Sequence, residues 1–409
     1  MPQKLPTLEE FYTTLENVRG IAIKTPMLHS QWLSDLTGQD IWFKCENLQR
    51  TGAYKLRGAY NMISQLSDAD KKRGVVAASA GNHAQGVALA AKQLGIKATI
   101  FMPVGASLPK YQATLGYGAN VVLSGAIFDE TLAAAKEFTA ETGAVFIPPF
   151  DHHDIILGQG TVALEILEQL PEVDNIVVCL GGGGLTAGVS LAAKLKAATM
   201  GRKVKVYAVQ AELAASYPPS LKAGKPVEVK VNPTIADGIA VARPGKLPFE
   251  IIKKYVDKVV TVTEDEIAKA MLAVMERSKL VVEAGGVVGA AALMSGKLKL
   301  KGTTAIVLSG GNIDPLLLQR VISHGLSASD RYTNISVMLP DRPGQLVRTA
   351  EAVAAARANV VEVLHTRHGN GLQISEVELN LSIETRGKEH RDELMKSLKA
   401  AGLRPRLHD

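Results

Sequence analysis

Four consecutive glycines, Gly181–Gly184, separate an apolar segment from a run of small residues. Each glycine costs ~0.5–1 kcal/mol relative to alanine inside a helix or strand, so packing is a poor reason for four of them. A loop without Cβ atoms lets its N–H groups converge on an anion, and a helix starting at Leu185 adds its positive end. We predict a phosphate-binding loop, although it lacks the lysine and spacing of the common nucleotide-binding motifs. The alternative is a flexible strand-to-helix turn.

Lys55 is a second candidate for chemistry. It follows the aromatic Tyr54 and opens a predicted helix over residues 55–65. Partial burial and the positive end of a helix both lower the pKa of a lysine toward the range in which its amine is a nucleophile. The alternative is a surface lysine whose stem lies along apolar groups, which is the usual case.

Two polar loops come directly after apolar segments. The loop 79–86 offers hydroxyl, amide and helix-start N–H groups that suit a carboxylate or a ring hydroxyl. His83 in this loop is alternatively a hydrogen-bonded structural histidine. The second loop, 309–312, presents Ser309, whose hydroxyl could exchange a hydrogen bond with a ring nitrogen. Its alternative is an ordinary strand-ending turn.

The composition excludes several classes of protein. With 46% hydrophobic and 21% charged residues among 409, the chain is neither mainly disordered nor collagen-like. The net charge of +6 is scattered, without the basic and aromatic stripe of a nucleic-acid groove. Cys45 and Cys179 lack a CxxC partner, and His152 with His153 forms no HxxxH or HExxH motif. We therefore expect no catalytic metal, no membrane span, no signal peptide and a reduced, cytoplasmic setting.

An apolar segment followed by glycines and then by a small-residue helix occurs three times. These segments are 75–83 before 84–94, 175–184 before 185–198, and 304–312 before 316–323. Strands that are apolar throughout and alternate with helices predict an α/β fold with a parallel sheet covered on both faces. In such sheets ligands bind at the carboxyl ends of the strands, where all three glycine turns fall.

The pattern changes near residue 326. Residues 326–333 are predicted to form a polar linker. Residues 334–409 then show the order βαββα, which is typical of a small α+β module. Its predicted strands lie near 335–339, 360–366 and 374–383, and its helices near 345–357 and 388–401.

Together these segments resemble the fold-type-II pyridoxal-phosphate enzymes, whose fold is that of the tryptophan synthase β chain, and specifically the threonine dehydratases (threonine ammonia-lyases). Six motifs occur in the family's order: KCENLQRTGAYKLRGA at 44–59, ASAGNHAQG at 78–86, GQGT at 158–161, GGGG at 181–184, ADGIA at 236–240 and SGGN at 309–312. The motif LPDRPGQL at 339–346 resembles a single ACT regulatory domain of ferredoxin-like fold. The resemblance implies a catalytic domain at 1–325, with a small lobe at about 45–147 inserted in a large lobe. It also implies a linker at 326–333 and an ACT-like domain at 334–409.

The resemblance also implies the residues of the site. Pyridoxal 5'-phosphate would be held as a Schiff base by Lys55, with Tyr54 packed near its ring. Asn82 would bond the 3-hydroxyl, and Ser309 would contact the pyridine nitrogen; a neutral serine there suits β-elimination. The phosphate would lie against Gly181, Gly182, Gly183, Gly184 and Leu185. Gly238 would be a further cofactor-binding residue, and the substrate would be bound by Ser79, Ala80, Gly81, Asn82 and His83.

The implied reaction is the dehydration and deamination of L-threonine, and of L-serine, to 2-oxobutanoate or pyruvate and ammonia. It would serve isoleucine biosynthesis or threonine catabolism. The resemblance further implies a cytoplasmic homo-oligomer, a dimer or tetramer, with isoleucine or valine as an effector bound by the ACT-like domain.

Three alternatives stay open. A serine racemase needs a second acid/base group, supplied in that family by a serine where this chain has Ala80. The racemase's divalent-cation carboxylates would fall around Gln210 and Ser216, which are not acidic. A non-catalytic amino-acid sensor would use only the C-terminal part. A synthase performing β-replacement would share the cofactor but usually lacks that part.

Overall fold

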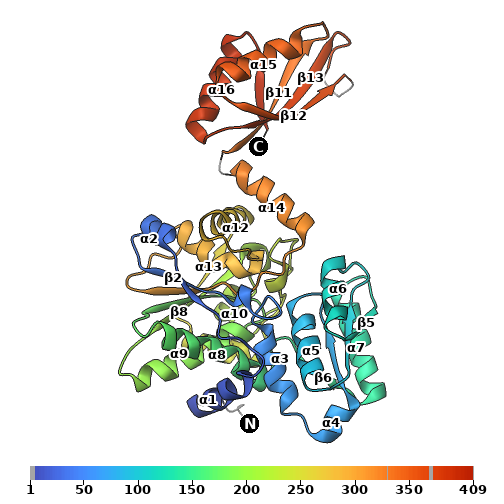
Figure 1. Cartoon of the computed structure of the whole chain (residues 1–409), viewed down its shortest axis with the longest axis vertical. Coiled ribbons are helices and arrows are strands. Elements are labelled where there is room, and N and C mark those ends of the chain that lie inside the picture. Colours follow the sequence, from blue (N-terminus) through green and yellow to red (C-terminus); the bar gives the residue numbers. More distant parts are fainter. Residues whose placement is uncertain (1–4, 329, 368–371, 409) are drawn as a thin grey trace. The chain divides into compact units, whose positions relative to one another are not determined.

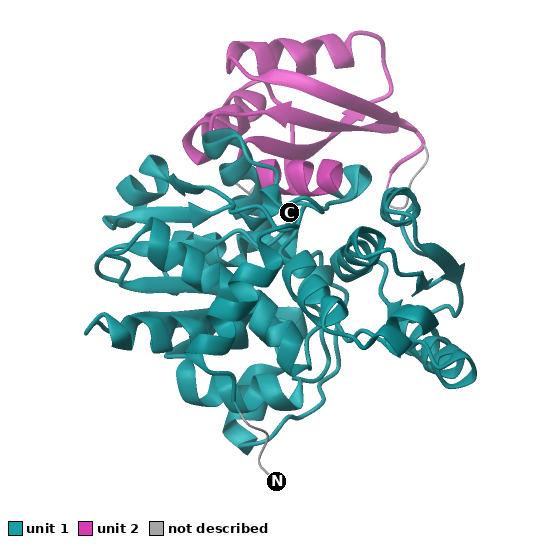
Figure 2. Ribbon diagram, turned by 60° about the horizontal axis from the view of Figure 1, so that its bottom comes forward, with its two compact units in different colours: residues 1–317 teal, residues 318–409 magenta. Residues whose placement is uncertain are grey.

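The computed structural model describes residues 5–328, 330–367 and 372–408. All residues expected in the site lie within these ranges. Residues 1–4 of the expected catalytic domain, residue 329 of the expected linker, and residues 368–371 and 409 of the C-terminal module lie outside them. The chain divides into two compact units, Met1–Leu317 (unit 1) and Leu318–Asp409 (unit 2), and each is described by itself (Figure 2).

Unit 1 contains a large sheet of six strands in the order β1-β2-β10-β7-β8-β9. Two of its strands, β2 and β8, are labelled in Figure 1. β1 is antiparallel to β2, and all other neighbours are parallel. All five residues of β7 are buried, which fits a strand covered on both faces. The strands are β1 (Met27–His29), β2 (Ile41–Lys44), β7 (Asn175–Cys179), β8 (Lys205–Ala211), β9 (Lys258–Val262) and β10 (Thr304–Val307).

A small parallel sheet of four strands forms a separate part of unit 1, in the order β5-β4-β3-β6. Its strands are β3 (Val75–Ala78), β4 (Ala98–Met102), β5 (Asn120–Leu123) and β6 (Val145–Phe146). Val75 and Ala77 of β3 pack in one apolar core, whereas the alternate residues Val76 and Ala78 pack in another on the opposite face. Both faces are covered, as predicted.

The parallel strands of the predicted pattern are divided between two sheets. The first glycine turn follows β3 of the small sheet, whereas the second and third follow β7 and β10 of the large sheet. An apolar strand is equally buried in either sheet, so periodicity cannot tell which strands become neighbours.

Helices surround both sheets of unit 1. α9 and α13 both contact β7 and β8, and α5 and α7 contact β3 and β4. Among the described residues, no helix is long and apolar enough to cross a membrane. The α-helices of unit 1 are α1 (Leu8–Val18), α2 (Gln31–Thr37), α3 (Lys55–Ser64), α4 (Asp68–Arg73), α5 (Asn82–Gln93), α6 (Leu108–Gly116), α7 (Phe128–Thr142), α8 (His153–Gln169), α9 (Gly184–Thr199), α10 (Tyr217–Ala223), α11 (Lys246–Tyr255), α12 (Glu264–Ser278) and α13 (Ala284–Met294), and the 3-10 helices are η1 (Glu46–Leu48), η2 (Glu212–Ala214) and η3 (Asp237–Ile239). α14 (Pro315–Ala328) begins in unit 1 and continues into unit 2.

Unit 2 is a four-stranded antiparallel sheet with two helices, in the strand order β12-β13-β11-β14. Its elements after α14 are β11 (Tyr332–Pro340), α15 (Gln345–Ala355), β12 (Asn359–Thr366), β13 (Glu376–Glu384), α16 (Lys388–Ala400) and β14 (Pro405–His408). Alternate residues of β11 and β13 form one core with the apolar faces of both helices. The short strand β14 completes a βαββαβ order. The sequence pattern missed β14 because a segment of four residues that includes a proline shows no strand periodicity.

The segment expected as a linker is mostly part of regular elements. α14 continues to Ala328, and β11 begins at Tyr332. Polar residues do not exclude a helix when one of its faces stays exposed.

Candidate active site

The tetraglycine loop joins β7 to the N-terminus of α9, as predicted from the sequence. Leu180 N–H makes the last sheet hydrogen bond, to Val209 O at 2.8 Å. In the described part of the chain, the backbone N–H groups of Gly181–Gly184 donate to no protein acceptor. The sixteen-residue helix α9 begins at Gly184, so its positive end lies at this loop. The loop therefore offers free donors to an anion such as a phosphate.

Packing also requires these glycines, contrary to the argument from the sequence. A Cβ on Gly181 would lie 3.0 Å from Ile239 Cα, and one on Gly184 would lie 2.9 Å from Phe150 Cα. A Cβ on Gly182 would collide with the ring of Phe150. Packing was underrated because these neighbours come from other segments of the chain. The close neighbours and the open N–H groups together make the loop a narrow cradle.

Lys55 is the first residue of α3, and its amine lies beside the loop that supports the cradle. Lys55 Nζ donates to Pro149 O at 2.8 Å, and the next residue, Phe150, packs against Gly182 and Gly184. The amine also lies 5.4 Å from the centre of the Tyr54 ring. The short segment 149–150 thus brings the predicted lysine and the predicted phosphate loop to one place.

Burial lowers the pKa of Lys55 to about 8, against the charge of Glu283, which raises it. A substantial fraction of the amine is therefore neutral near pH 8 and able to attack a carbonyl carbon. The side chain remains partly exposed, so it is reachable by a ligand. These properties fit a lysine that binds a cofactor covalently.

His83 is buried beneath the same segment. Its Nε2 lies 2.8 Å from Ile147 O. Burial, together with the positive charge of Lys55, lowers the pKa of His83 to about 3, so the ring is neutral at physiological pH. Because Ile147 O can only accept, Nε2 carries the proton. His83 therefore holds segment 147–150 through this hydrogen bond. A contact between His83 and the substrate remains a prediction.

Asn82 lies at the centre of a series of side-chain hydrogen bonds that joins both sheets. Its Nδ2 donates to Glu283 Oε1 at 2.7 Å, and its Oδ1 accepts from Asn312 Nδ2 at 2.9 Å. Asn312 Nδ2 also donates to Thr51 O at 2.6 Å, in the lysine motif. The first and third glycine turns therefore meet, although their strands belong to different sheets.

Ser309 lies next to the lysine motif. Ser309 O accepts from Tyr54 N–H at 3.2 Å, and Ala53 pairs with Gly310 in an isolated antiparallel bridge. Cys179 Sγ, at the end of β7, lies 3.3 Å from Ser309 Oγ. Because burial raises the pKa of Cys179 to about 11, it stays a thiol and can donate to that oxygen. The Ser309 hydroxyl is thus held where the ends of β7 and β10 meet.

The remaining predicted residues lie around this centre. Gly238, in η3, faces Glu283, because a Cβ placed on it would be 3.7 Å from Glu283 Oε1. Leu185 is buried in the first turn of α9. Ser79 Oγ accepts from Gly81 N–H at 3.2 Å, and Ala80 and Gly81 are partly exposed in the turn before α5.

Glu283 is the main residue that the sequence reasoning missed. It is 8% exposed, precedes α13, and its N–H donates to Gly310 O at 2.9 Å. A signal existed, because Glu283 is the only charged residue between Leu280 and Leu293. Pro149, Phe150 and Asn312 were also missed, since nothing local distinguishes them.

The residues present fit pyridoxal 5'-phosphate. The glycine cradle offers N–H donors for a phosphate, Lys55 offers a neutral amine for an aldehyde, and Asn82 and Ser309 offer polar atoms for the ring substituents. In the described ranges, no group of three or more histidine, cysteine or acidic residues could hold a metal ion.

Glu283 makes stability depend on pH. Burial, and then Asp237, raise the pKa of Glu283 to about 7. A carboxyl group with a raised pKa in the folded state stabilises that state while protonated. This stability is complete below pH ~4.5 and is lost as pH rises through 7. Glu283→Gln, which mimics the protonated form, should unfold like the wild type at pH 5. At pH 8 it should be the more stable, by up to about 3 kcal/mol.

The measurement is urea unfolding of both cofactor-free proteins at pH 5, 6, 7 and 8. A stability difference that does not change with pH would contradict the prediction.

Comparisons with known proteins agree with this geometry. The family model described as "Pyridoxal-phosphate dependent enzyme" matches residues 18–310. An L-threonine ammonia-lyase of Thermotoga maritima is 47% identical over 402 residues, which are 98% of this chain and 99% of that protein. The expected relationship to threonine dehydratases and the expected cofactor are confirmed.

Solved structures show the same fold over most of the chain. Maize serine racemase matches with a TM-score of 0.74 and 35% identity, covering 79% of this chain and 99% of that one. Processed threonine deaminase isoform 2 from Solanum lycopersicum matches with a TM-score of 0.73 and 36% identity, covering 79% and 98%. The chain therefore belongs to the pyridoxal-phosphate-dependent enzymes and has their fold-type-II architecture.

Proposed function

We propose that the protein dehydrates and deaminates L-threonine to 2-oxobutanoate and ammonia, and L-serine to pyruvate and ammonia. The observation that carries the proposal is the convergence of Lys55, the tetraglycine cradle and the Asn82 turn around segment 147–150. The whole-length similarity to an L-threonine ammonia-lyase supports threonine as the substrate.

Each residue has a role in this proposal. When bound, pyridoxal phosphate supplies a ring that withdraws electrons from the amino acid's Cα. Lys55 Nζ first holds the cofactor and then removes the α-proton, which suits an amine whose pKa is about 8. Residues 79–83 bind the substrate's carboxylate through hydroxyl and helix-start N–H groups. The tetraglycine loop, with Leu185, holds the phosphate.

Ser309 and Asn82 set the electronic state of the ring. The neutral hydroxyl of Ser309 would leave the ring nitrogen largely unprotonated, which would moderate electron withdrawal and suit β-elimination. Asn82 is held in place by Glu283, which accepts from its Nδ2, and by Asn312, which donates to its Oδ1. From this position its amide would bond the ring hydroxyl. Gly238 borders the same region.

The direct test is an assay of 2-oxoacid formation from threonine and serine, together with the visible absorbance of the purified protein. We expect a yellow protein that forms 2-oxobutanoate. A colourless protein without turnover would favour the amino-acid sensor. A yellow protein that joins serine to an added nucleophile, without releasing a 2-oxoacid, would favour the synthase.

Racemisation is not expected, despite the structural similarity to maize serine racemase. Removing a proton on one face of Cα and returning it on the other requires a second acid/base group. Ala80 carries none, and Gln210 and Ser216 are uncharged and buried. A positioned proton donor contributes ~10²-fold or more to the rate of proton transfer. Without one, L-serine should give pyruvate, with D-serine below about 1% of the product. Chiral chromatography checks this result, and rapid formation of D-serine would contradict it.

We propose further that unit 2 is an ACT domain that binds an apolar amino acid as effector, isoleucine or valine. A cavity of about 290 Å³ lies between β11, the start of α15 and β12. It combines apolar and charged side chains, as a zwitterion with an aliphatic side chain needs. They include Leu339, Leu346, Val377, Leu379, Asp341, Arg342 and Arg367.

A homo-oligomer, dimer or tetramer, is proposed on a separate observation. β12 is an edge strand, and its apolar side chains Val361, Val363 and Leu364 are 38% to 56% exposed. Such an edge is suited to pairing with a second copy. A cytoplasmic location remains a prediction, as does the choice between isoleucine biosynthesis and threonine catabolism.

Deleting residues 330–409 should leave threonine turnover within about threefold of the full chain and abolish its response to isoleucine, because the cavity is removed. In the full chain, Arg342→Ala should weaken the response, whereas Arg404→Ala, an exposed residue outside the cavity, should not. Steady-state rates with and without isoleucine measure both effects. If isoleucine still acts on the truncated enzyme, the effector site lies elsewhere.

A further inference from the structure

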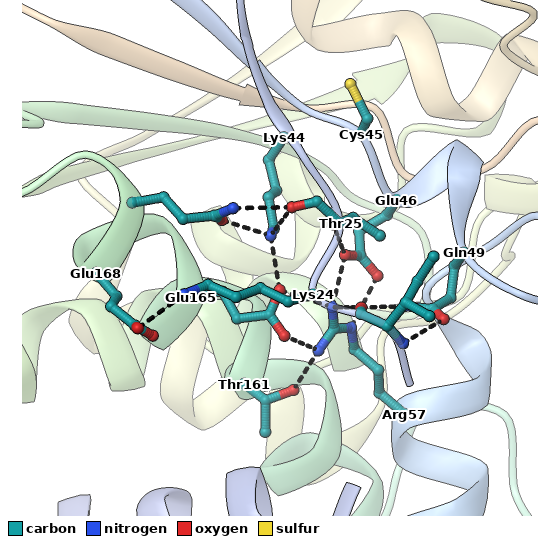
Figure 3. Close-up of polar contacts among 12 residues, drawn as sticks. Lys24, Thr25, Lys44, Cys45, Glu46, Gln49, Arg57, Thr161, Glu165 and Glu168 are labelled. Atoms are coloured by element: carbon teal, nitrogen blue, oxygen red, sulfur yellow. Dashed lines mark hydrogen bonds and ion pairs between the residues drawn. The ribbon is translucent and has the colours of Figure 1, made fainter. Parts of the chain in front are cut away.

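Four charged side chains lie buried on the side of α3 opposite the candidate site. They are Lys44, Glu46, Arg57 and Glu165 (Figure 3). None of them is more than 4% exposed. Lys44, Glu46 and Arg57 belong to the motif that carries Lys55, yet the proposed function gives them no role. We refer to the four residues as the buried ion network.

Arg57 is the centre of the buried ion network. Its Nε and Nη2 donate to the two oxygens of Glu46, both at 2.8 Å. Its Nη1 and Nη2 donate to the two oxygens of Glu165, at 2.6 and 2.9 Å. Nη1 also lies 3.2 Å from Thr161 Oγ1, and Nη2 lies 3.2 Å from Ile23 O. A planar guanidinium held by two carboxylates is fixed in position and in rotation.

Lys44 completes the charge balance. Its ammonium group donates to Glu165 Oε2 at 2.6 Å, to Thr25 O at 2.7 Å and to Gln169 Oε1 at 2.8 Å. Two positive and two negative side chains thus share one buried volume. Burial alone would raise the pKa of Glu46, but Arg57 lowers it below its usual value, so the carboxylate stays charged.

The network ties α3 to four other segments. Lys44 ends β2, Glu46 lies in η1, Glu165 lies on α8, and residues 23–25 contribute backbone carbonyls. Backbone packing reinforces the contact of α3 with α8, because a Cβ on Gly158 would lie 2.6 Å from Arg57 O. Neither sliding nor rotation of the first turn of α3 is possible without breaking these contacts.

Lys55 is two residues before Arg57. Residues two apart on an α-helix point about 200° apart, so when Arg57 faces the network, Lys55 faces the opposite side. There its amine reaches Pro149 O, beside the tetraglycine cradle. The position of the amine is thus set by the rotation of α3, and that rotation is set by Arg57.

We propose that Arg57 is a positioning residue, and that its two carboxylate pairs hold α3 in the rotation at which Lys55 captures the cofactor. This inference rests on the proposed role of Lys55. Buried ion pairs are weak contributors to stability compared with apolar side chains of the same volume, whereas bidentate pairs specify geometry. The four buried charges are therefore explained by the precise position that they give to α3, rather than by a gain in folding stability.

The test compares Arg57→Lys with Ile267→Ala in the full-length holoenzyme. Arg57→Lys keeps the charge and loses the two-pronged geometry. Ile267 is fully buried in α12, a helix that packs mainly on α13 and not on α3, so its truncation destabilises unit 1 without removing a contact of the network. Thermal midpoints establish how strongly each variant is destabilised. Glu165→Gln, which has the same size as the native residue, is measured in parallel in case Arg57→Lys does not fold.

Two readouts report on Lys55 itself. One is pyridoxal-phosphate affinity from the visible absorbance. The other is the fraction of cofactor fixed on Lys55 by borohydride, from peptide mass spectrometry. We expect Arg57→Lys or Glu165→Gln to lose about tenfold to 100-fold in affinity, because misplacing a reacting group by ~1 Å costs up to about 100-fold in its reaction and the amine must react to hold the cofactor. At equal or greater destabilisation, Ile267→Ala should keep wild-type affinity.

A loss in the network variants no larger than that in Ile267→Ala overturns the proposal. Neither readout involves threonine. If the wild type binds cofactor at Lys55 but does not deaminate threonine, the proposed function fails while the comparison still decides the role of Arg57.

Discussion

Replacing Lys55 by alanine is expected to lower threonine turnover by at least about 10⁴-fold and to abolish the absorbance band of cofactor joined covalently to residue 55. General acid–base catalysis alone contributes ~10²–10⁴-fold, and the variant also loses the covalent attachment. The cradle and the Asn82 turn remain, so the cofactor should still bind, without a covalent link. Turnover is measured as 2-oxoacid formation, and the absorbance by titration with pyridoxal phosphate.

Lys136→Ala provides the matched control, because Lys136 is an exposed lysine of α7. It should leave both readouts unchanged. Should Lys55→Ala retain more than a hundredth of the wild-type rate, another residue would have to remove the α-proton.

The pH dependence of cofactor capture gives an independent check on Lys55. Burial lowers the pKa of its amine to about 8, and only the neutral amine has a lone pair to donate. The capture rate should therefore rise about tenfold per pH unit below 8 and level off above it. A stopped-flow record of absorbance from pH 6 to 9 measures this. A rate that still rises tenfold per unit between pH 8 and 9 would mean that the amine has an ordinary lysine pKa, and a flat profile below pH 8 would assign the capture to another group.

The sequence was sufficient to predict the glycine turns and the candidate residues on them, but not strand β14 or Glu283. Periodicity located the strands that end in glycine turns, and those turns meet in the structure. It could not assign β3 to a separate sheet, because an apolar strand shows the same pattern beside any neighbour. From its local sequence, Lys55 could be either a nucleophile or a surface lysine. The family resemblance identified it as the lysine expected to bind the cofactor.

Residues that act through partners far apart in the sequence could not be predicted. Glu283 and Asn82 are 201 positions apart, and Arg57 and Glu165 are 108 apart. A carboxylate in an apolar segment signals a buried charge, but its partner depends on how sheets and helices are placed. The glycines of the cradle show the same limit. Their exposed N–H groups could be predicted, whereas the aromatic ring of Phe150 against them could not.

Gly183→Ala should weaken pyridoxal-phosphate binding by about 100-fold or more. Gly183 has φ +104°, a backbone conformation that residues with a Cβ rarely adopt. A Cβ there would collide with the hydroxyl of Tyr217 and lie 2.8 Å from Pro248 Cβ and 3.0 Å from Ile252 Cδ1. These neighbours are buried, and the Tyr217 hydroxyl is 3.3 Å from its acceptor Gly182 O, so they cannot withdraw freely. The loop itself must move, and its N–H groups then leave the phosphate.

Gly201→Ala separates this effect from backbone strain alone. Gly201 follows the same helix, has φ +64°, and faces open space. An alanine at positive φ costs about 1–2 kcal/mol of stability at either position. Both variants should therefore lose a similar amount of stability to strain, but only Gly183→Ala should lose cofactor affinity, which equilibrium titration of the visible absorbance measures. Equal affinity in the two variants would mean that the cradle does not hold the phosphate. In that case α9 would contribute only its packing, and the anion would have to be bound by other donors near Lys55.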